Sequence, residues 1–178
     1  MSFKLNFLAH SLSKAIRDTK IKGFVELITE LASIQVVYNP EKITFKNIKK
    51  EIEDVYLNLG DLDDQELNSR IYYIPVLYFD PWTKSCVEDY SLKNKIKKEF
   101  DPDLIVKLNK LNDREELKRI HSGTDYWVAA LGFWPGLCSL IPLDPRNRLT
   151  APKYNPPRLW TPKGTIGLGG SITSIYPD

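Results

Sequence analysis

Apolar residues near the N-terminus recur at the spacing of an α-helix, which predicts an amphipathic helix over residues 3–16. Its apolar positions are Phe3, Phe7, Leu8, Leu12, Ala15 and Ile16. Further along, the β-branched run IQVVY at residues 34–38 is followed by Asn39 and Pro40. Because β-branched residues favour strands and Asn-Pro favours turns, this run predicts a buried strand that ends in a turn.

A second helical pattern covers residues 44–59 and stops at Gly60, a residue type that commonly follows the last turn of a helix. Its apolar positions are Phe45, Ile48, Ile52, Val55, Tyr56 and Leu59. The run IYYIPVLYF then predicts a strand over residues 71–79, which Pro75 restricts to a sheet edge or a bulge. Helix, strand, helix and strand in so short a stretch indicate a small α+β domain over residues 1–82.

Residues 83–100 are charged and irregular, which indicates a linker or an insertion. Asp101 followed by Pro102 predicts an N-cap with proline at the first helical position. Asp113 with Glu116 resembles a capping box at the start of a further helix.

After Gly123 the pattern changes, because seven of the twelve prolines lie between Pro135 and Pro162. Short apolar runs, YWVAAL, LW and TIGLGG, alternate there with turn residues. Such alternation is typical of a β-barrel or sandwich with many bends. We therefore expect residues 83–178 to form a second domain that is rich in β structure.

The chain has 178 residues, of which 42% are hydrophobic and 27% are charged, with a formal net charge of +2. These values describe an ordinary globular protein of one or two domains with a sizeable core. Lysine and arginine are interspersed with aspartate and glutamate, so no concentrated basic patch points to a nucleic acid. We expect no nucleic acid among the partners.

Two cysteines occur, Cys86 and Cys138, and neither belongs to a CxxC motif. Cysteines used this sparingly favour the reducing cytoplasm. No stretch approaches the roughly 20 apolar residues of a membrane span, so no membrane association is expected. Two histidines and two cysteines so far apart do not form a metal-ligand cluster, and we expect no metal site.

The segment LGFWPGLCSL at residues 131–140 places two large aromatic residues on backbone that Pro135 and Gly136 keep out of regular helix or strand. Phe133 and Trp134 either cap a core from a loop or offer a rigid apolar surface to a ligand or partner. Both alternatives remain open from the sequence.

Two polar residues are candidates for recognition. Arg158 follows two prolines, so its backbone is stiff and its guanidinium is able to offer a bidentate fork to a carboxylate. Pairing with a nearby surface aspartate is the alternative. His121 ends a predicted helix, where it either caps that helix or donates to the same anion as Arg158. The Gly-rich run at residues 165–170 lacks the Lys-Ser/Thr pair of a phosphate loop, so no nucleotide is expected there.

Seven motifs follow one another along the chain: IPVLY, FDPDL, an Ile-His pair, YWVAALGFWPG, PPR, KGTIGLGG and IYP. In this order they resemble the family of the B subunit of 5-oxoprolinase, also called allophanate hydrolase subunit 1 or the sporulation-kinase inhibitor family. They are similar as well to part of the carboxyltransferase domain of urea carboxylase. Upstream, the order of elements and the segment VVYNP agree with the same family.

The resemblance implies a ferredoxin-like domain over residues 1–82 and a cyclophilin-like β-barrel over residues 83–178. It places the GF-x-PG loop beside a ligand groove of the barrel and assigns no catalytic residue. The substrate- or partner-binding residues that the motifs imply are His121, Tyr126, Gly132, Phe133, Trp134, Pro135, Gly136, Arg158 and Tyr176.

The resemblance implies three alternative functions. The first is an accessory subunit of an ATP-dependent 5-oxoprolinase-like amidohydrolase or related carboxylase, inactive alone, that binds a small carboxylate or amide. ATP is then expected on a partner subunit, and no cofactor on this chain. The second function is inhibition of a sensor histidine kinase, and the third is a purely structural subunit. The expected partners are the other subunits of a hetero-oligomer, or a second copy in a homodimer.

The chain also departs from the family pattern. The family begins with a Gly-Asp-Ala strand and continues past IYP, whereas this sequence starts in a predicted helix and stops at Asp178. Both ends are therefore expected to be trimmed. The segments SLIPLDP and SITS and the Pro152-Lys153 pair replace the family's usual residues. Because these positions include polar ones that contact substrate in the expected groove, the changes favour an accessory role over independent catalysis.

Overall fold

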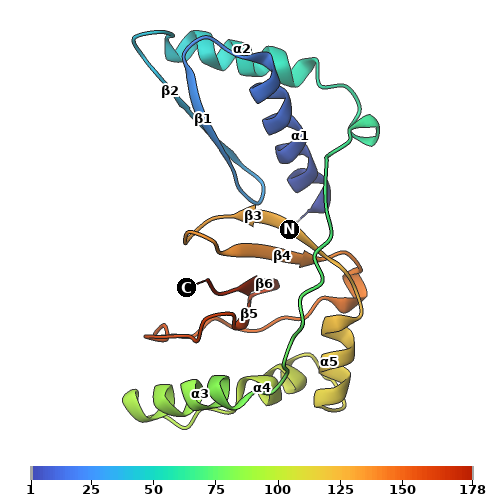
Figure 1. Ribbon diagram of the computed structural model, residues 1–178, viewed down its shortest axis with the longest axis vertical. Coiled ribbons are helices and arrows are strands. Elements are labelled where there is room, and N and C mark those ends of the chain that lie inside the picture. The colour runs from blue at the N-terminus through green and yellow to red at the C-terminus, as the bar shows by residue number, and fades with distance from the viewer. Residues whose placement is uncertain (1, 178) are drawn as a thin grey trace. The chain divides into compact units, whose positions relative to one another are not determined.

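The computed structural model describes residues 2–177, and the chain divides into two compact units, residues 1–72 and 73–178. The sequence predicts this boundary ten residues later, at residue 82. Both units contain helices and strands (Figure 1), so the expected mixture of α and β structure is confirmed.

The first unit consists of a β-hairpin and two helices. Its elements are α1 (Phe3–Thr19), β1 (Phe24–Thr29), β2 (Ile34–Tyr38), α2 (Phe45–Leu57) and a short 3₁₀ helix, Leu62–Asp64. Strands β1 and β2 pair antiparallel. The two predicted helices and the strand over β2 are therefore confirmed, whereas β1 has no counterpart among the predicted elements.

Buried polar side chains attach α1 to the hairpin. Asn6 donates from Nδ2 to the carbonyl of Leu31 at 2.8 Å. Thr29 of β1 donates to the hydroxyl of Ser13 at 2.7 Å, and Ser13 donates in turn to the carbonyl of Ala9. Since buried polar groups are stable only when they are hydrogen-bonded, these bonds fix the position of the helix on the hairpin.

The core of the first unit lies between the helices and the hairpin. Its buried residues are Ile16 on α1, Ile21, Leu27 on β1 and Ile48 on α2. Helix α2 starts at an N-cap, Thr44, whose hydroxyl accepts a hydrogen bond from the backbone N–H of Asn47. The predicted amphipathic faces of both helices thus meet in one core.

Residues 71–77 form no strand, so the strand predicted over residues 71–79 is wrong. The segment is irregular and its apolar side chains are exposed. A β-prone sequence becomes a strand only where a neighbouring strand accepts its hydrogen bonds, and none of the described strands pairs with this segment. Pro75 also removes one backbone donor.

Three helices open the second unit: α3 (Pro81–Lys93), α4 (Asp101–Leu108) and α5 (Arg114–Ser122). Figure 1 shows them together on the β5 side of the sheet that follows. Asp113 caps α5 by accepting from the backbone N–H of Glu116, and the Glu116 carboxylate accepts from the N–H of Asn112. Both expected helices are confirmed, and Asp113 is the N-cap of α5. The N-cap predicted at Asp101 is wrong, because Asp101 is the first residue of α4 and Phe100 precedes it as the N-cap.

Helix α3 occupies most of the segment that the sequence suggested was a linker, so that expectation is wrong. Its apolar residues form no clear stripe, but Cys86 and Tyr90 are buried. The Cys86 thiol donates to the carbonyl of Trp160, and the Tyr90 hydroxyl donates to the carbonyl of Pro156 at 2.8 Å. Contacts with residues distant in sequence therefore stabilise a helix that the local pattern does not reveal.

A four-stranded antiparallel sheet completes the second unit. Its strands are β3 (Tyr126–Leu131), β4 (Cys138–Pro142), β5 (Ile166–Gly169) and β6 (Ile172–Ile175), in the spatial order β3-β4-β6-β5. The apolar runs YWVAAL and TIGLGG supply β3 and β5, as the sequence predicts. Among the residues described, no helix has the length and apolar character needed to cross a membrane.

Replacing Ile48 by alanine is expected to lower the free energy of unfolding by about 2–5 kcal/mol, because Ile48 is 2% exposed and its loss leaves a cavity. Urea unfolding followed by far-UV circular dichroism measures this change. Leu57→Ala is the matched control, because Leu57 lies on the same helix and is 76% exposed. A shift below about 0.5 kcal/mol in both variants would contradict the assignment of the core.

Candidate functional site

The loop between β3 and β4 has a turn that its sequence dictates. Trp134 accepts at its carbonyl a hydrogen bond of 3.0 Å from the N–H of Leu137. Pro135 and Gly136 occupy the two central positions, and Gly136 has a φ of 83°. Proline followed by glycine at positive φ is the pattern of a type II turn, so the Pro-Gly pair fixes the shape of this loop.

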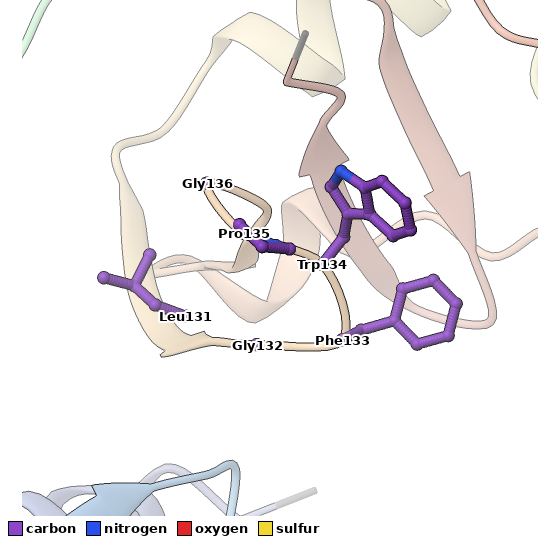
Figure 2. Close-up of a pocket in the computed structure, with 6 residues that line it drawn as sticks. All are labelled: Leu131, Gly132, Phe133, Trp134, Pro135 and Gly136. Carbon is purple, nitrogen blue, oxygen red and sulfur yellow. The ribbon is translucent and has the colours of Figure 1, made fainter.

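Two aromatic rings stand on this turn. Phe133 is 98% exposed and Trp134 is 58% exposed. Figure 2 shows both rings projecting on one side of the loop and Leu131 projecting on the other. Residues 131–136 line an open hollow of about 280 Å³. Phe133 therefore does not fill the end of a core, which was one of the two alternatives that the sequence left open.

The backbone of Phe133 is strained. Its φ of 67° lies in the left-handed region, which a bulky residue rarely adopts and which costs about 1–3 kcal/mol. The loop thus holds an exposed ring in an unfavourable backbone conformation without gaining burial for it.

His121, at the C-terminal end of α5, lies between two tyrosines. The Tyr78 hydroxyl is hydrogen-bonded to His121 Nδ1 at 2.7 Å, and the two rings meet edge to face with centroids 5.7 Å apart. The Tyr126 hydroxyl donates to the His121 carbonyl at 3.0 Å, with ring centroids 5.4 Å apart. The structure therefore brings together two predicted site residues, His121 and Tyr126, and adds Tyr78.

Burial governs the protonation of this cluster. It lowers the pKa of His121 below its usual value of 6.5, so the imidazole is neutral at neutral pH. Burial, together with the nearby Tyr78, raises the pKa of Tyr126 to about 12. The pKa of Tyr78 is also raised, chiefly by burial. All three side chains are uncharged near pH 7.

Arg158 belongs to a different cluster, built around the carboxylate of Asp101. The Tyr154 hydroxyl donates to both Asp101 oxygens, at 2.7 and 2.8 Å. Arg158 lies 3.6 Å from Asp101 Oδ2, and Lys98 lies 3.7 Å from Oδ1. Both cations also lie near the Tyr154 ring, at 4.6 and 4.2 Å from its centroid. Burial and then the hydrogen bond to Asp101 raise the pKa of Tyr154.

Arg158 and His121 are not brought together. The side chain of Arg158 is 14% exposed, and its guanidinium contacts Asp101, Tyr154 and the Cys86 sulfur. In the part of the chain that the structure describes, no hydrogen bond or ion pair joins it to His121. Arg158 therefore pairs with an aspartate, as the alternative had it, but with one that is distant in sequence and half-buried rather than local and at the surface.

Tyr176, the last predicted site residue, follows β6 and packs on Gly167 of β5. A Cβ atom at Gly167 would lie 2.8 Å from the Tyr176 ring, so glycine leaves the room that the ring occupies. Glycine residues 132 and 136 and Pro135 shape the loop rather than present side chains. The predicted residues thus fall into separate places on one unit.

Four residues of these clusters were missed by sequence reasoning: Tyr78, Lys98, Asp101 and Tyr154. Tyr78 ends the IPVLY motif and Asp101 lies in FDPDL, so motif membership was a usable signal for both. Lys98 and Tyr154 lie in segments whose fold places them beside Asp101, and no local pattern indicates this. Within residues 2–177, no three His, Cys, Asp or Glu side chains gather into a group able to hold a metal ion.

Residues 1–178 match the family described as "Carboxyltransferase domain, subdomain C and D". The chain belongs to this carboxyltransferase family. It is 30% identical over 186 residues to the B subunit of 5-oxoprolinase from Bacillus subtilis (strain 168), with 98% of this chain and 68% of that protein covered. The family resemblance carried by the sequence motifs is confirmed.

Other relatives are much longer. The chain is 27% identical over 181 residues to urea amidolyase of Saccharomyces cerevisiae, a match that covers 99% of this chain and 10% of that protein. Among solved structures, it resembles the urea carboxylase of Kluyveromyces lactis with a TM-score of 0.84 and 24% identity. That match covers 99% of this chain and 16% of the other, so the two share a fold over one segment of the larger enzyme.

Tyr154→Phe is expected to lower the free energy of unfolding by about 1.5–3 kcal/mol, because it removes a hydroxyl that donates to a carboxylate. Chemical unfolding measures the change. Tyr73→Phe is the control, because Tyr73 is 87% exposed in the same unit. Equal stabilities of the two variants would show that the Asp101 cluster contributes nothing to the fold.

The lowered pKa of His121 predicts a loss of stability in acid. The unfolded chain binds the proton more tightly than the folded chain does, so this contribution is fully present above about pH 6.5 and is lost as the pH falls toward the folded pKa. Urea midpoints should therefore fall between about pH 7 and 5. In His121→Asn this component is absent, so the stability difference between the two proteins should narrow in acid. If the stabilities of the two proteins changed in parallel with pH, the assigned pKa shift of His121 would be contradicted.

Proposed function

We propose that this chain is the subdomain C and D component of a multi-subunit, ATP-dependent enzyme that hydrolyses or carboxylates a small amide. The full-length family match and the coverage of the B subunit of 5-oxoprolinase support this proposal. The urea amidolyase relative supports a chemically related amide substrate. A ferredoxin-like first domain and a cyclophilin-like second domain are part of the same proposal.

In this proposal ATP binds to a partner subunit. The Gly-rich run at residues 165–170 forms β5 and the turn into β6, and no helix follows it among the described residues. A phosphate loop needs a helix N-terminus behind its glycines. This chain contributes a binding surface and no cofactor.

The aromatic loop is the proposed contact with the partner subunit. The observation that carries this step is the exposure of Phe133, 98%, on a turn fixed by Pro135 and Gly136. Small molecules favour enclosed pockets, whereas exposed aromatic anchors on stiff loops commonly dominate protein interfaces. The backbone of Phe133 is strained and its ring is exposed, so the ring becomes buried only when a partner covers it. The open hollow at residues 131–136 therefore favours a protein over a small ligand.

The test is recovery of the complex from the native host with the tagged chain. Phe133→Ala combined with Trp134→Ala should weaken partner binding by more than about 2 kcal/mol, or roughly 30-fold, with little change in melting temperature. Leu92→Ala is the control, because Leu92 is an exposed apolar residue of the same unit.

The identity of the captured protein decides the function. A large subunit that binds ATP supports the proposal. A histidine kinase in its place would favour the inhibitor function, and unchanged capture by the double variant would exclude the loop as the contact.

A further inference from the structure

The contact between Tyr78 and His121 defines the tautomer of the imidazole. Their atoms are 2.7 Å apart, and a single proton occupies the bond. A phenol is a much stronger proton donor than a neutral imidazole N–H, and an imidazole nitrogen is a stronger acceptor than a phenol oxygen. This difference favours donation from Tyr78 to Nδ1, which leaves the proton of His121 on Nε2.

Two further hydroxyls lie near His121. Tyr126 donates to the backbone carbonyl of His121. Ser122 donates to the carbonyl of Lys118 at 2.8 Å and also interacts with the Tyr78 hydroxyl. The Nε2–H group has no hydrogen-bond acceptor among residues 2–177. An oxygen acceptor placed beside Nε2 would complete the hydrogen bonding of the ring.

Two tyrosines also fix the orientation of the His121 ring. Tyr78 meets it edge to face, and Tyr126 lies tilted against it. Burial keeps the imidazole neutral. An uncharged N–H on a ring that two tyrosines contact suits an oxygen acceptor on a small molecule, that is, an amide carbonyl or a carboxylate.

We propose that Tyr78 is a positioning residue that fixes His121 in the Nε2–H tautomer, and that this N–H binds an oxygen of a small amide or carboxylate ligand. The ligand class rests on the proposed function, whereas the tautomer rests on the contact with Tyr78 and on the greater acidity of the phenol. Tyr78 does not touch the ligand in this arrangement, because its hydroxyl is occupied by Nδ1.

Nitrogen NMR tests both parts on the isolated full-length chain. The sequence contains two histidines, His10 and His121, so ¹⁵N-labelled histidine gives two sets of ring signals. His10→Gln assigns them. We expect His121 to show the shifts of a single Nε2–H tautomer, and Tyr78→Phe to show a mixture of both tautomers. An Nδ1–H tautomer in the unaltered protein would overturn the assignment, and this measurement requires no variant at His121.

Three probes at millimolar concentration test the ligand: 2-pyrrolidinone supplies the lactam carbonyl, cyclopentanecarboxylate supplies the carboxylate, and 5-oxoproline supplies both. At least one should shift the His121 Nε2 signal and leave His10 unchanged, and the shift should shrink in Tyr78→Phe. The two single-group probes show which oxygen is bound. No shift with any probe would overturn the ligand assignment. Because no partner is present, failure to capture a partner subunit leaves this result unaffected.

Discussion

Strand β6 connects the parts of the second unit on which any function depends. It pairs with β4 on one side and β5 on the other, so it is one of the two central strands and the one that joins β5 to the rest of the sheet. Thr173 on β6 is buried and hydrogen-bonds to Tyr126, which in turn holds His121. Pro177, beyond its end, packs against Gly136 in the aromatic loop. One short strand thereby positions both the polar cluster and the loop.

The loop at residues 131–136 and the His121 cluster differ in burial and in the kind of contact that they offer. The loop at residues 131–136 is stiff but unburied, so its rings offer contact area at little entropic cost when a partner arrives. The His121 cluster is buried and uncharged, so it offers directional hydrogen bonding rather than area. The Asp101 cluster has a structural role instead. Through Tyr154 and Arg158 it attaches the segment around Arg158 to α4.

Local patterns revealed those elements whose stability is largely local. Helices α1, α2 and α5 have apolar faces or caps that are visible in the sequence, and β2 has a run of β-branched residues. Helix α3 was missed because Cys86 and Tyr90 are buried by residues some 70 positions away. Residues 71–77 were misassigned because their composition favours a strand, but no described strand lies beside them to pair with. The motifs identified candidate site residues but carried no information on which of them face one another, so the separation of Arg158 from His121 was not predictable.

This separation bears on the ligand that we propose for His121. A ligand carboxylate at Arg158 would lie beside the Asp101 carboxylate, and two like charges at that distance repel strongly in a half-buried environment. Arg158 is therefore better suited to its internal partner than to a ligand. Among residues 2–177, no carboxylate hydrogen-bonds to His121, so an oxygen at the N–H that we propose for it meets no such repulsion.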